Sequence, residues 1–127
     1  MGKQFINLPH VHNYPYSQAV KIGDCVYISG QIGVQDPETG EELTGFEEQC
    51  QQCLENFKKI LELAGASLKD LVKVNVFLRN VEDYNAMNEV FRRYFPSYQP
   101  ARSTMVSVLV KPNILVEIDG IAYCSSN

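Results

Sequence analysis

Between residues 46 and 64, apolar side chains recur at steps of three and four residues, a spacing typical of an amphipathic α-helix. These positions are Phe46, Cys50, Cys53, Leu54, Phe57, Ile60, Leu61 and Ala64. Thr44 and Glu47 predict a capping box at the start of this helix, and Gly65 predicts its end. A helix of this length has to bury its apolar side, so the chain must supply a second layer for it to pack against.

Alternating apolar and polar residues predict the strands of that second layer. The expected strands are residues 18–32, split into a hairpin by Gly23-Asp24, then 71–78, 103–110 and 115–123. A second amphipathic helix is expected from its N-cap Asn80 to Tyr94, and the turn Lys111-Pro112-Asn113 joins the last two strands. Because both helices need a partner surface, we predict a single domain over residues 1–127. Its fold is an α+β two-layer sandwich, with a mixed sheet and both helices on one face.

Two short motifs resemble metal or redox sites. Cys50 and Cys53 have the C-x-x-C spacing of half a zinc site, but both fall on the apolar side of the predicted helix. His10 and His12 form an H-x-H in a loop, with no third ligand nearby. Free cysteine is among the most buried residue types, and neither motif completes a tetrahedral site. We therefore expect core thiols and a solvated loop, with no metal.

Composition argues against two classes of partner. The formal net charge is −4, whereas nucleic-acid binding relies on lysine and arginine side chains that neutralise phosphates. No apolar run approaches the ~20 residues needed to span a bilayer, and the first residues, MGKQFINLPHVHN, lack the apolar stretch of a signal peptide. We expect a soluble cytoplasmic protein that binds neither nucleic acid nor membrane.

A few polar residues stand at positions that suggest chemistry. Arg102 lies at the mouth of an apolar strand pattern, and Glu117 interrupts the last strand. Ser29 and Gly30 lie near the end of the segment YISGQ, where glycine lets a ligand approach the backbone closely. Tyr16 supplies an aromatic ring just before the first predicted strand. Together these residues would provide a cation, a carboxylate and the wall of a pocket.

Seven segments of the chain share their residues and spacing with one known family. They are PYSQAV (15–20), YISGQIG (27–33), DPETGE (36–41), VKVNVFL (72–78), MNEVF (87–91), PARST (100–104) and VEIDGIA (116–122). In this order they resemble the Rid family of reactive-intermediate imine/enamine deaminases, also labelled YjgF-type or L-PSP endoribonuclease-like. The resemblance extends from about residue 15 to residue 122.

The resemblance implies a chorismate-mutase-like fold that assembles as a homotrimer, with ligand sites in the clefts between subunits. Active members hydrolyse 2-imino acids and their 2-enamine tautomers, such as 2-iminobutyrate and 2-aminoacrylate, to 2-ketoacids and ammonia. They use no cofactor and no metal. We therefore expect a 2-iminobutanoate/2-iminopropanoate deaminase whose partner is a small imino or enamino acid.

The resemblance also implies which residues form the site. The matching positions are Tyr16, Ser29, Gly30, Arg102, Thr104 and Glu117. A planar guanidinium at Arg102 can bind a carboxylate through two parallel hydrogen bonds, which orients the substrate. Glu117 can hold a water molecule and accept its proton, while backbone groups near Gly30 and Thr104 fix the imine end.

Two other functions stay open at the level of sequence. One is an L-PSP-type endoribonuclease or translation inhibitor. The acidic net charge and the lack of an evident His/His or His/Lys pair for RNA cleavage count against it. The other is a non-catalytic carboxylate-binding or chaperone-like module that uses the same cleft.

The predicted last hairpin raises a geometric problem for the catalytic pair. If residues 110 and 114 flank a tight turn, Glu117 pairs near Ser107 and Arg102 lies five residues further along. At ~3.3 Å per residue this is roughly 16 Å, too far for both to contact one small substrate. Either the last two strands are not simple hairpin neighbours, or Glu117 meets the arginine of an adjacent subunit. The trimeric clefts of the family favour the second.

Overall fold

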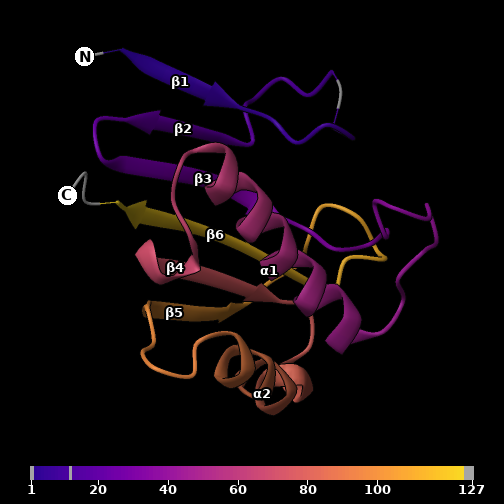
Figure 1. The fold of residues 1–127 in the computed structure, drawn as a ribbon. Helices are drawn as coiled ribbons and strands as arrows, with labels where there is room; N and C mark the ends of the chain where they lie inside the picture. Colours follow the sequence, from indigo (N-terminus) through magenta and orange to yellow (C-terminus); the bar gives the residue numbers. More distant parts are fainter. Residues whose placement is uncertain (1, 12, 125–127) are drawn as a thin grey trace.

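The computed structural model describes residues 2–11 and 13–124, in which a six-stranded sheet and two α-helices form two layers. Across the sheet, the strands are β1 (Lys3–Ile6), β2 (Ala19–Ile22), β3 (Cys25–Gln31), β6 (Val116–Tyr123), β4 (Leu71–Leu78) and β5 (Ala101–Val106). The helices are α1 (Phe46–Leu63) and α2 (Tyr84–Tyr94). Figure 1 shows α1 in front of the middle strands and α2 along the β5 side of the sheet. The predicted α+β sandwich of a mixed sheet and two helices is confirmed.

The order of the strands confirms one predicted hairpin and contradicts the other. Ile22 pairs with Cys25 across Gly23, whose φ of 58° lies in the left-handed region that glycine adopts without strain. The expected hairpin between the last two strands is wrong. β5 and β6 flank β4 on opposite sides, with β5 parallel to it and β6 antiparallel.

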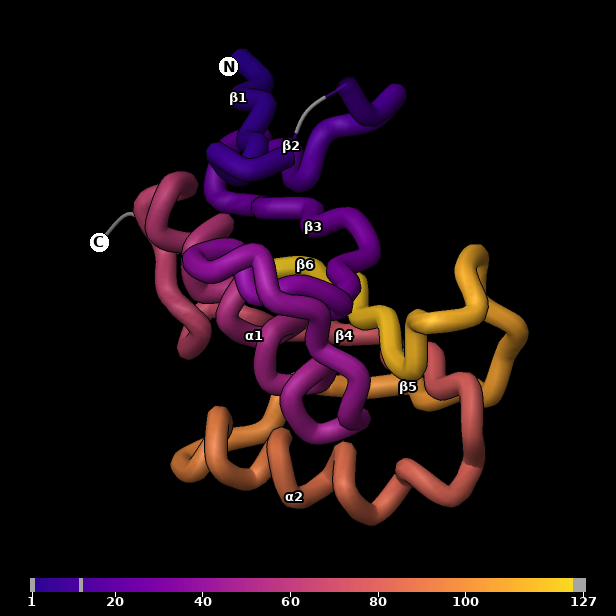
Figure 2. Tube along the Cα trace, turned by 90° about the vertical axis from the view of Figure 1, so that its right-hand side faces the viewer, coloured from indigo at the N-terminus to yellow at the C-terminus, as the bar shows by residue number. Residues whose placement is uncertain are grey.

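Arg79 holds the connection between β5 and β6 in place. Its guanidinium group donates hydrogen bonds to the carbonyls of Ile114 at 2.7 Å and Lys111 at 2.6 Å. Ile114 is buried, whereas Val110 is 87% exposed. Figure 2 shows this connection, coloured orange to yellow, standing away from the two layers.

Helix α1 begins one residue later than predicted. Gly45 is its N-cap, and the Glu48 carboxylate accepts hydrogen bonds from the backbone N–H groups of Thr44 at 2.8 Å and Gly45 at 2.9 Å. Glu47, expected in that role, instead accepts a hydrogen bond from Arg93 on α2 at 2.9 Å. The helix ends as predicted, because Gly65, with a φ of +79°, lies just past the C-cap.

Helix α2 also begins later than the predicted cap. Asn80 starts a short 3₁₀ turn, Val81–Asp83, and α2 follows from Tyr84. A 3₁₀ turn is a frequent lead-in to an α-helix. The predicted apolar side is buried at Met87 and Phe91, but Tyr84 remains 44% exposed at its edge.

Cys50 and Cys53 lie in the core between α1 and the sheet, as predicted. Neither has exposed surface, and the Cys53 thiol donates a hydrogen bond to the carbonyl of Gln31 at 3.2 Å. Burial raises the pKa of Cys50 to about 12 and raises the pKa of Cys53 as well. Burial thus favours the neutral thiol form, which packs well in an apolar core.

Replacing Cys50 or Cys53 with alanine should lower the free energy of unfolding by about 1 kcal/mol, a typical loss for one buried truncation. Catalytic activity per folded molecule should not change. Urea unfolding measures the first quantity and an imine-hydrolysis assay the second. Stoichiometric zinc in untagged protein, measured by mass spectrometry, would contradict the assignment of both thiols to the core.

Candidate active site

A β-bulge in β3 brings Gly30 against Glu117. The pairing of β3 with β6 shifts register between Ile28 and Gln31, so Ser29 and Gly30 together oppose a single position of β6. Bulges of this kind bend a strand and are common beside active sites. A Cβ atom on residue 30 would overlap the Glu117 carboxylate. Glycine at this position therefore allows the carboxylate to lie directly over the bulge.

Hydrogen bonds attach the segment that carries Tyr16 to the same bulge. The Ser29 hydroxyl donates to the carbonyl of Ser17 at 2.7 Å, and the Ser29 backbone N–H donates to the carbonyl of Gln18 at 2.9 Å. The Tyr16 ring stacks on Tyr14, with ring centres 5.4 Å apart and an interplanar angle of 6°. Ser29 thus holds the Tyr16 segment beside the bulge.

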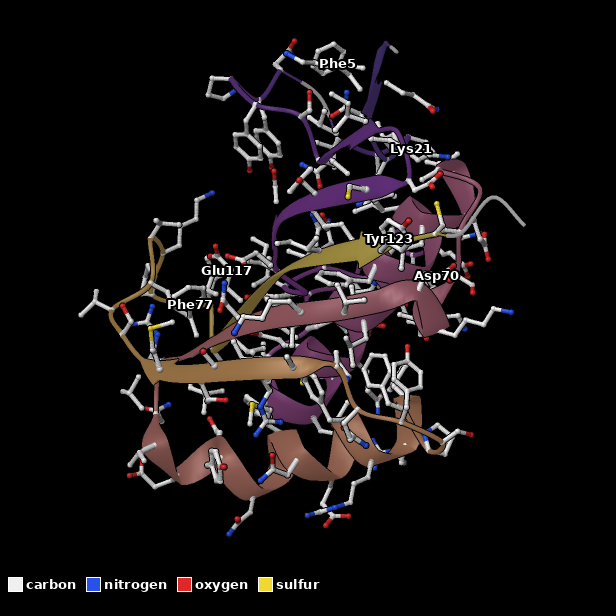
Figure 3. All side chains as sticks on the ribbon, turned by 90° about the vertical axis from the view of Figure 1, so that its left-hand side faces the viewer. Phe5, Lys21, Asp70, Phe77, Glu117 and Tyr123 are labelled. Carbon is white, nitrogen blue, oxygen red and sulfur yellow. The ribbon has the colours of Figure 1, made fainter. Side chains whose placement is uncertain are left out.

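Four predicted site residues line one cavity of about 720 Å³ on the sheet face opposite the helices. They are Tyr16, Ser29, Gly30 and Glu117. Figure 3 shows Glu117 beside Phe77, its cross-strand partner on β4. The size of this cavity suits a small-molecule ligand.

The Glu117 carboxylate is half-buried, in surroundings that disfavour its charge. Burial raises the pKa of Glu117, and the nearby Asp119 carboxylate raises it further. Asp119 lies two residues along β6, on the same face, and accepts a hydrogen bond from Asn75 at 2.9 Å. A carboxyl group whose pKa is raised is better matched to proton transfer near neutral pH.

Replacing Asp119 with asparagine should extend activity to lower pH. Removing the like charge makes Glu117 easier to ionise, so its pKa falls and the acid limb of the profile of kcat/KM against pH moves down. The amide oxygen can still accept the hydrogen bond from Asn75. Glu38→Gln removes the same charge outside this cavity and serves as the control. An acid limb that stays in place for Asp119→Asn, or that moves equally in both variants, would contradict the coupling.

Arg102 and Thr104 lie on the other face of the sheet, under the helices. Arg102 pairs with Val74 of β4, whereas Glu117 pairs with Phe77, three positions along the same strand. Because side chains alternate along a strand, an odd separation places the two residues on opposite faces. They are also two strands apart, which adds about 10 Å across the sheet. Within one chain the structure therefore does not bring Arg102 to the cavity of Glu117.

Arg102 instead borders a separate recess of about 400 Å³ between β5 and α2. Thr104 lies two residues further along β5, paired with the buried Val76. β5 lies at one edge of the sheet, so this recess lies at the border of the sheet. The predicted site residues therefore fall into two groups. The group around Glu117 lies on the sheet face opposite the helices, here called the open face, and the group around Arg102 lies on the edge strand β5.

The cavity on the sheet face opposite the helices also contains two polar side chains, Asp119 and Tyr27, that the sequence did not predict as site residues. Asp119 shares the face of Glu117, and its position two residues further along a predicted strand could have revealed it. Tyr27 lines the same cavity, one strand away. Alternation of side chains along a strand could have revealed Asp119. The placement of Tyr27 in this cavity depends on which strands become neighbours, and this cannot be read from the local sequence.

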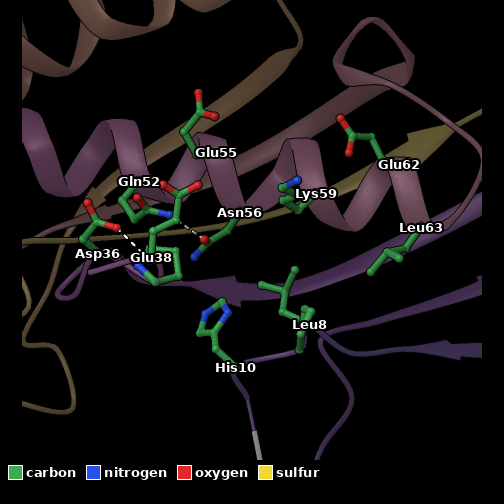
Figure 4. Close-up of a pocket in the computed structure, with 12 residues that line it drawn as sticks. Leu8, His10, Asp36, Glu38, Gln52, Glu55, Asn56, Lys59, Glu62 and Leu63 are labelled. Atoms are coloured by element: carbon green, nitrogen blue, oxygen red, sulfur yellow. Dashed lines mark hydrogen bonds between the residues drawn. The ribbon is translucent and has the colours of Figure 1, made fainter. Parts of the chain in front are cut away.

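A second large cavity, of about 670 Å³, lies between α1, the N-terminal loop and the turn at residues 36–38 (Figure 4). It is lined by charged side chains, including Glu38, Lys59 and Glu62, and by His10. None of the predicted site residues reaches it. His12, the other half of the H-x-H, lies outside the described residues. Within residues 2–11 and 13–124, no cluster of three His, Cys, Asp or Glu side chains could hold a metal ion.

Fold and site together define a class: small α+β proteins with a carboxylate cavity on the open sheet face and an arginine on the edge strand. The family described as Endoribonuclease L-PSP matches residues 9–124. No helix in the described part of the chain is long and apolar enough to cross a membrane.

Known relatives agree with this class over most of their length. The chain is 46% identical over 110 residues to a RutC family protein of Pyrococcus abyssi, covering 86% of each chain. It is 45% identical over 108 residues to a 2-iminobutanoate/2-iminopropanoate deaminase of Dermatophagoides farinae, covering 84% of each. The crystal structure of RidA from an Antarctic Psychrobacter superposes with a TM-score of 0.87 at 43% identity, over 95% of this chain and 99% of that one. This protein belongs to the Rid family, as the resemblance of its sequence predicted.

Proposed function

We propose that this protein hydrolyses small 2-imino acids, and their 2-enamine tautomers such as 2-aminoacrylate, to 2-ketoacids and ammonia. The observation that carries the proposal is the half-buried Glu117 carboxylate lying over Gly30 in a cavity of small-molecule size. Further support comes from relatives named 2-iminobutanoate/2-iminopropanoate deaminase in Dermatophagoides farinae and Homo sapiens, at 45% and 38% identity.

The reaction adds water to a carbon–nitrogen double bond and then expels ammonia. An enamine first becomes the imine by gaining a proton at C3 and losing one from nitrogen. Water attacks the imine carbon while Glu117 accepts one of its protons, and the π electron pair moves to nitrogen. Glu117 returns that proton to the nitrogen, which gives a carbon bearing both a hydroxyl and an amino group. Glu117 then takes the hydroxyl proton and delivers it to the amino group. Ammonia leaves as the carbon–oxygen double bond forms, and the carboxylate is regenerated.

The remaining site residues hold the substrate during these steps. Arg102 binds the substrate carboxylate through its two parallel N–H groups. The Tyr16 phenol, whose pKa is raised by burial, can donate a hydrogen bond to the substrate. The backbone near Gly30 and Thr104 orients the imine nitrogen. Positioning of this kind can lower a barrier by several kcal/mol.

A complete site requires two chains, because Arg102 and Glu117 lie on opposite faces of one sheet. We propose that Glu117 of one chain and Arg102 of its neighbour share a substrate within a homotrimer. β5 is an edge strand, a natural place for contact with another chain. The open face also exposes large side chains, including Tyr27, Ile121 and Tyr123, and exposed apolar patches of this kind mark protein interfaces. The cytoplasmic location stays a prediction from sequence.

A coupled assay tests the proposed reaction. An amino-acid oxidase generates 2-iminobutyrate from 2-aminobutyrate, and release of 2-ketobutyrate is followed with and without the protein. We expect faster release with the protein, and release at the buffer rate with Glu117→Gln. If the unmodified protein also gives the buffer rate yet binds 2-ketobutyrate, a non-catalytic carboxylate-binding module is the better description. RNA cleavage that is lost in the same variant would favour the endoribonuclease.

A further inference from the structure

Arg102 is held in place by aromatic rings. Its guanidinium carbon lies 5.2 Å from the ring centre of Phe91 and 5.9 Å from that of Tyr84. Both rings belong to α2 and are seven residues apart, so they lie on one side of the helix, two turns from each other. Phe91 is 2% exposed and Tyr84 is 44% exposed, which makes one ring part of the core and the other part of the rim.

The other arginine side chains are held differently. Arg92 and Arg93 donate to glutamate carboxylates at 3.0 and 2.9 Å, and Arg79 donates to backbone carbonyls. Across the described ranges 2–11 and 13–124, the Arg102 side chain has neither a hydrogen bond nor an ion pair. Its charge is therefore positioned without engaging its N–H groups.

This difference matters for binding an anion. A cation over a ring interacts with the electrons of the ring face, whereas a carboxylate binds to the N–H groups in the guanidinium plane. An arginine fixed by a salt bridge has to exchange one carboxylate for another. An arginine fixed by rings keeps its donors available and loses less conformational freedom when the ligand binds.

We propose that Tyr84 and Phe91 are positioning residues that hold the Arg102 guanidinium ready for the substrate carboxylate. This inference rests on the proposed function, which assigns carboxylate binding to Arg102. It adds that affinity for a carboxylate depends on the electron density of the ring at position 84, in addition to the charge of Arg102 itself.

Position 84 gives the cleaner test, because Tyr84 is exposed at the rim whereas Phe91 is packed in the core. Tyr84 is replaced with phenylalanine, with phenylalanine carrying an increasing number of ring fluorines, and with leucine. Fluorination weakens the ring face while changing its size little. The dissociation constant for 2-ketobutyrate is measured by calorimetry, and the melting temperature of each variant is recorded.

We expect the phenylalanine variant to bind like the unmodified protein. The dissociation constant for 2-ketobutyrate should then rise with each added fluorine. It should be about two- to five-fold higher for the most fluorinated ring and for leucine, while the melting temperature stays constant. Equal affinity across the series would overturn the role of the rings while leaving carboxylate binding intact. Failure of the unmodified protein to bind more tightly than Arg102→Ala would overturn the carboxylate site itself, and the positioning role with it.

Discussion

Replacing Arg102 with alanine should remove most of the hydrolysis of 2-iminobutyrate while leaving the fold intact. Loss of a two-pronged charged contact costs about 2–5 kcal/mol of binding, or roughly 30- to 5,000-fold in kcat/KM. The fold should survive, because within residues 2–11 and 13–124 the Arg102 side chain is held by two ring contacts worth about 1 kcal/mol each. Steady-state kinetics in the oxidase-coupled assay measure the first effect, and thermal unfolding measures the second.

Two further variants identify what is lost in Arg102→Ala. Arg102→Lys keeps the charge but not the planar pair of donors, so it should be nearly as inactive. Lys58→Ala removes the same charge from an exposed pair with Glu55, whose side chains are 47% and 46% exposed, and should keep its activity. Near-normal turnover by folded Arg102→Ala would exclude the proposed role. Equal losses in Lys58→Ala would show that net charge alone matters.

Mixing two inactive chains should restore activity if each site is shared between neighbours. Chains carrying Arg102→Ala and chains carrying Glu117→Ala are dissociated, combined in equal amounts and allowed to reassemble. In a closed ring, half of the sites receive an intact Glu117, and half of those also receive an intact Arg102 from the next chain. We therefore expect about one quarter of the activity of the unmodified protein.

Each variant taken alone through the same dissociation and reassembly is the control, and should stay inactive. Native mass spectrometry verifies that mixed assemblies have formed. If well-mixed assemblies remain inactive, the two residues do not act on one substrate from adjacent chains. A protein that is monomeric in solution and still active would contradict the shared site independently.

Local sequence patterns predicted helix α1 but not the exact residue at which it begins. The period of apolar residues predicted α1 and its end at Gly65, because both depend on neighbours a few positions away. The start was misplaced by one residue, since Glu47 and Glu48 are both glutamates able to reach back to the cap. In the folded chain Glu47 contacts Arg93 of α2, which leaves Glu48 to cap the helix. This contact joins segments far apart in the chain, so the local sequence could not predict it.

Strand β1 was not predicted, because only Ile6 of its four residues is buried and its residues do not alternate between apolar and polar.

The spacing of apolar residues along the chain was enough to predict the two-layer class and the burial of Cys50 and Cys53. The site residues came from the resemblance to the family and stay a prediction. The placement of β4 between β5 and β6 followed from strand pairing in the folded chain, and with it the placement of Arg102 and Glu117 on opposite faces of the sheet. The two results differ because the interactions behind them act over different distances along the chain. Periodicity reports which side of an element is buried, whereas the order of strands depends on pairing between distant segments. The local sequence does not show that Arg102 lies on an edge strand and Glu117 on a central one. Their separation follows only from the order of the strands in the folded sheet.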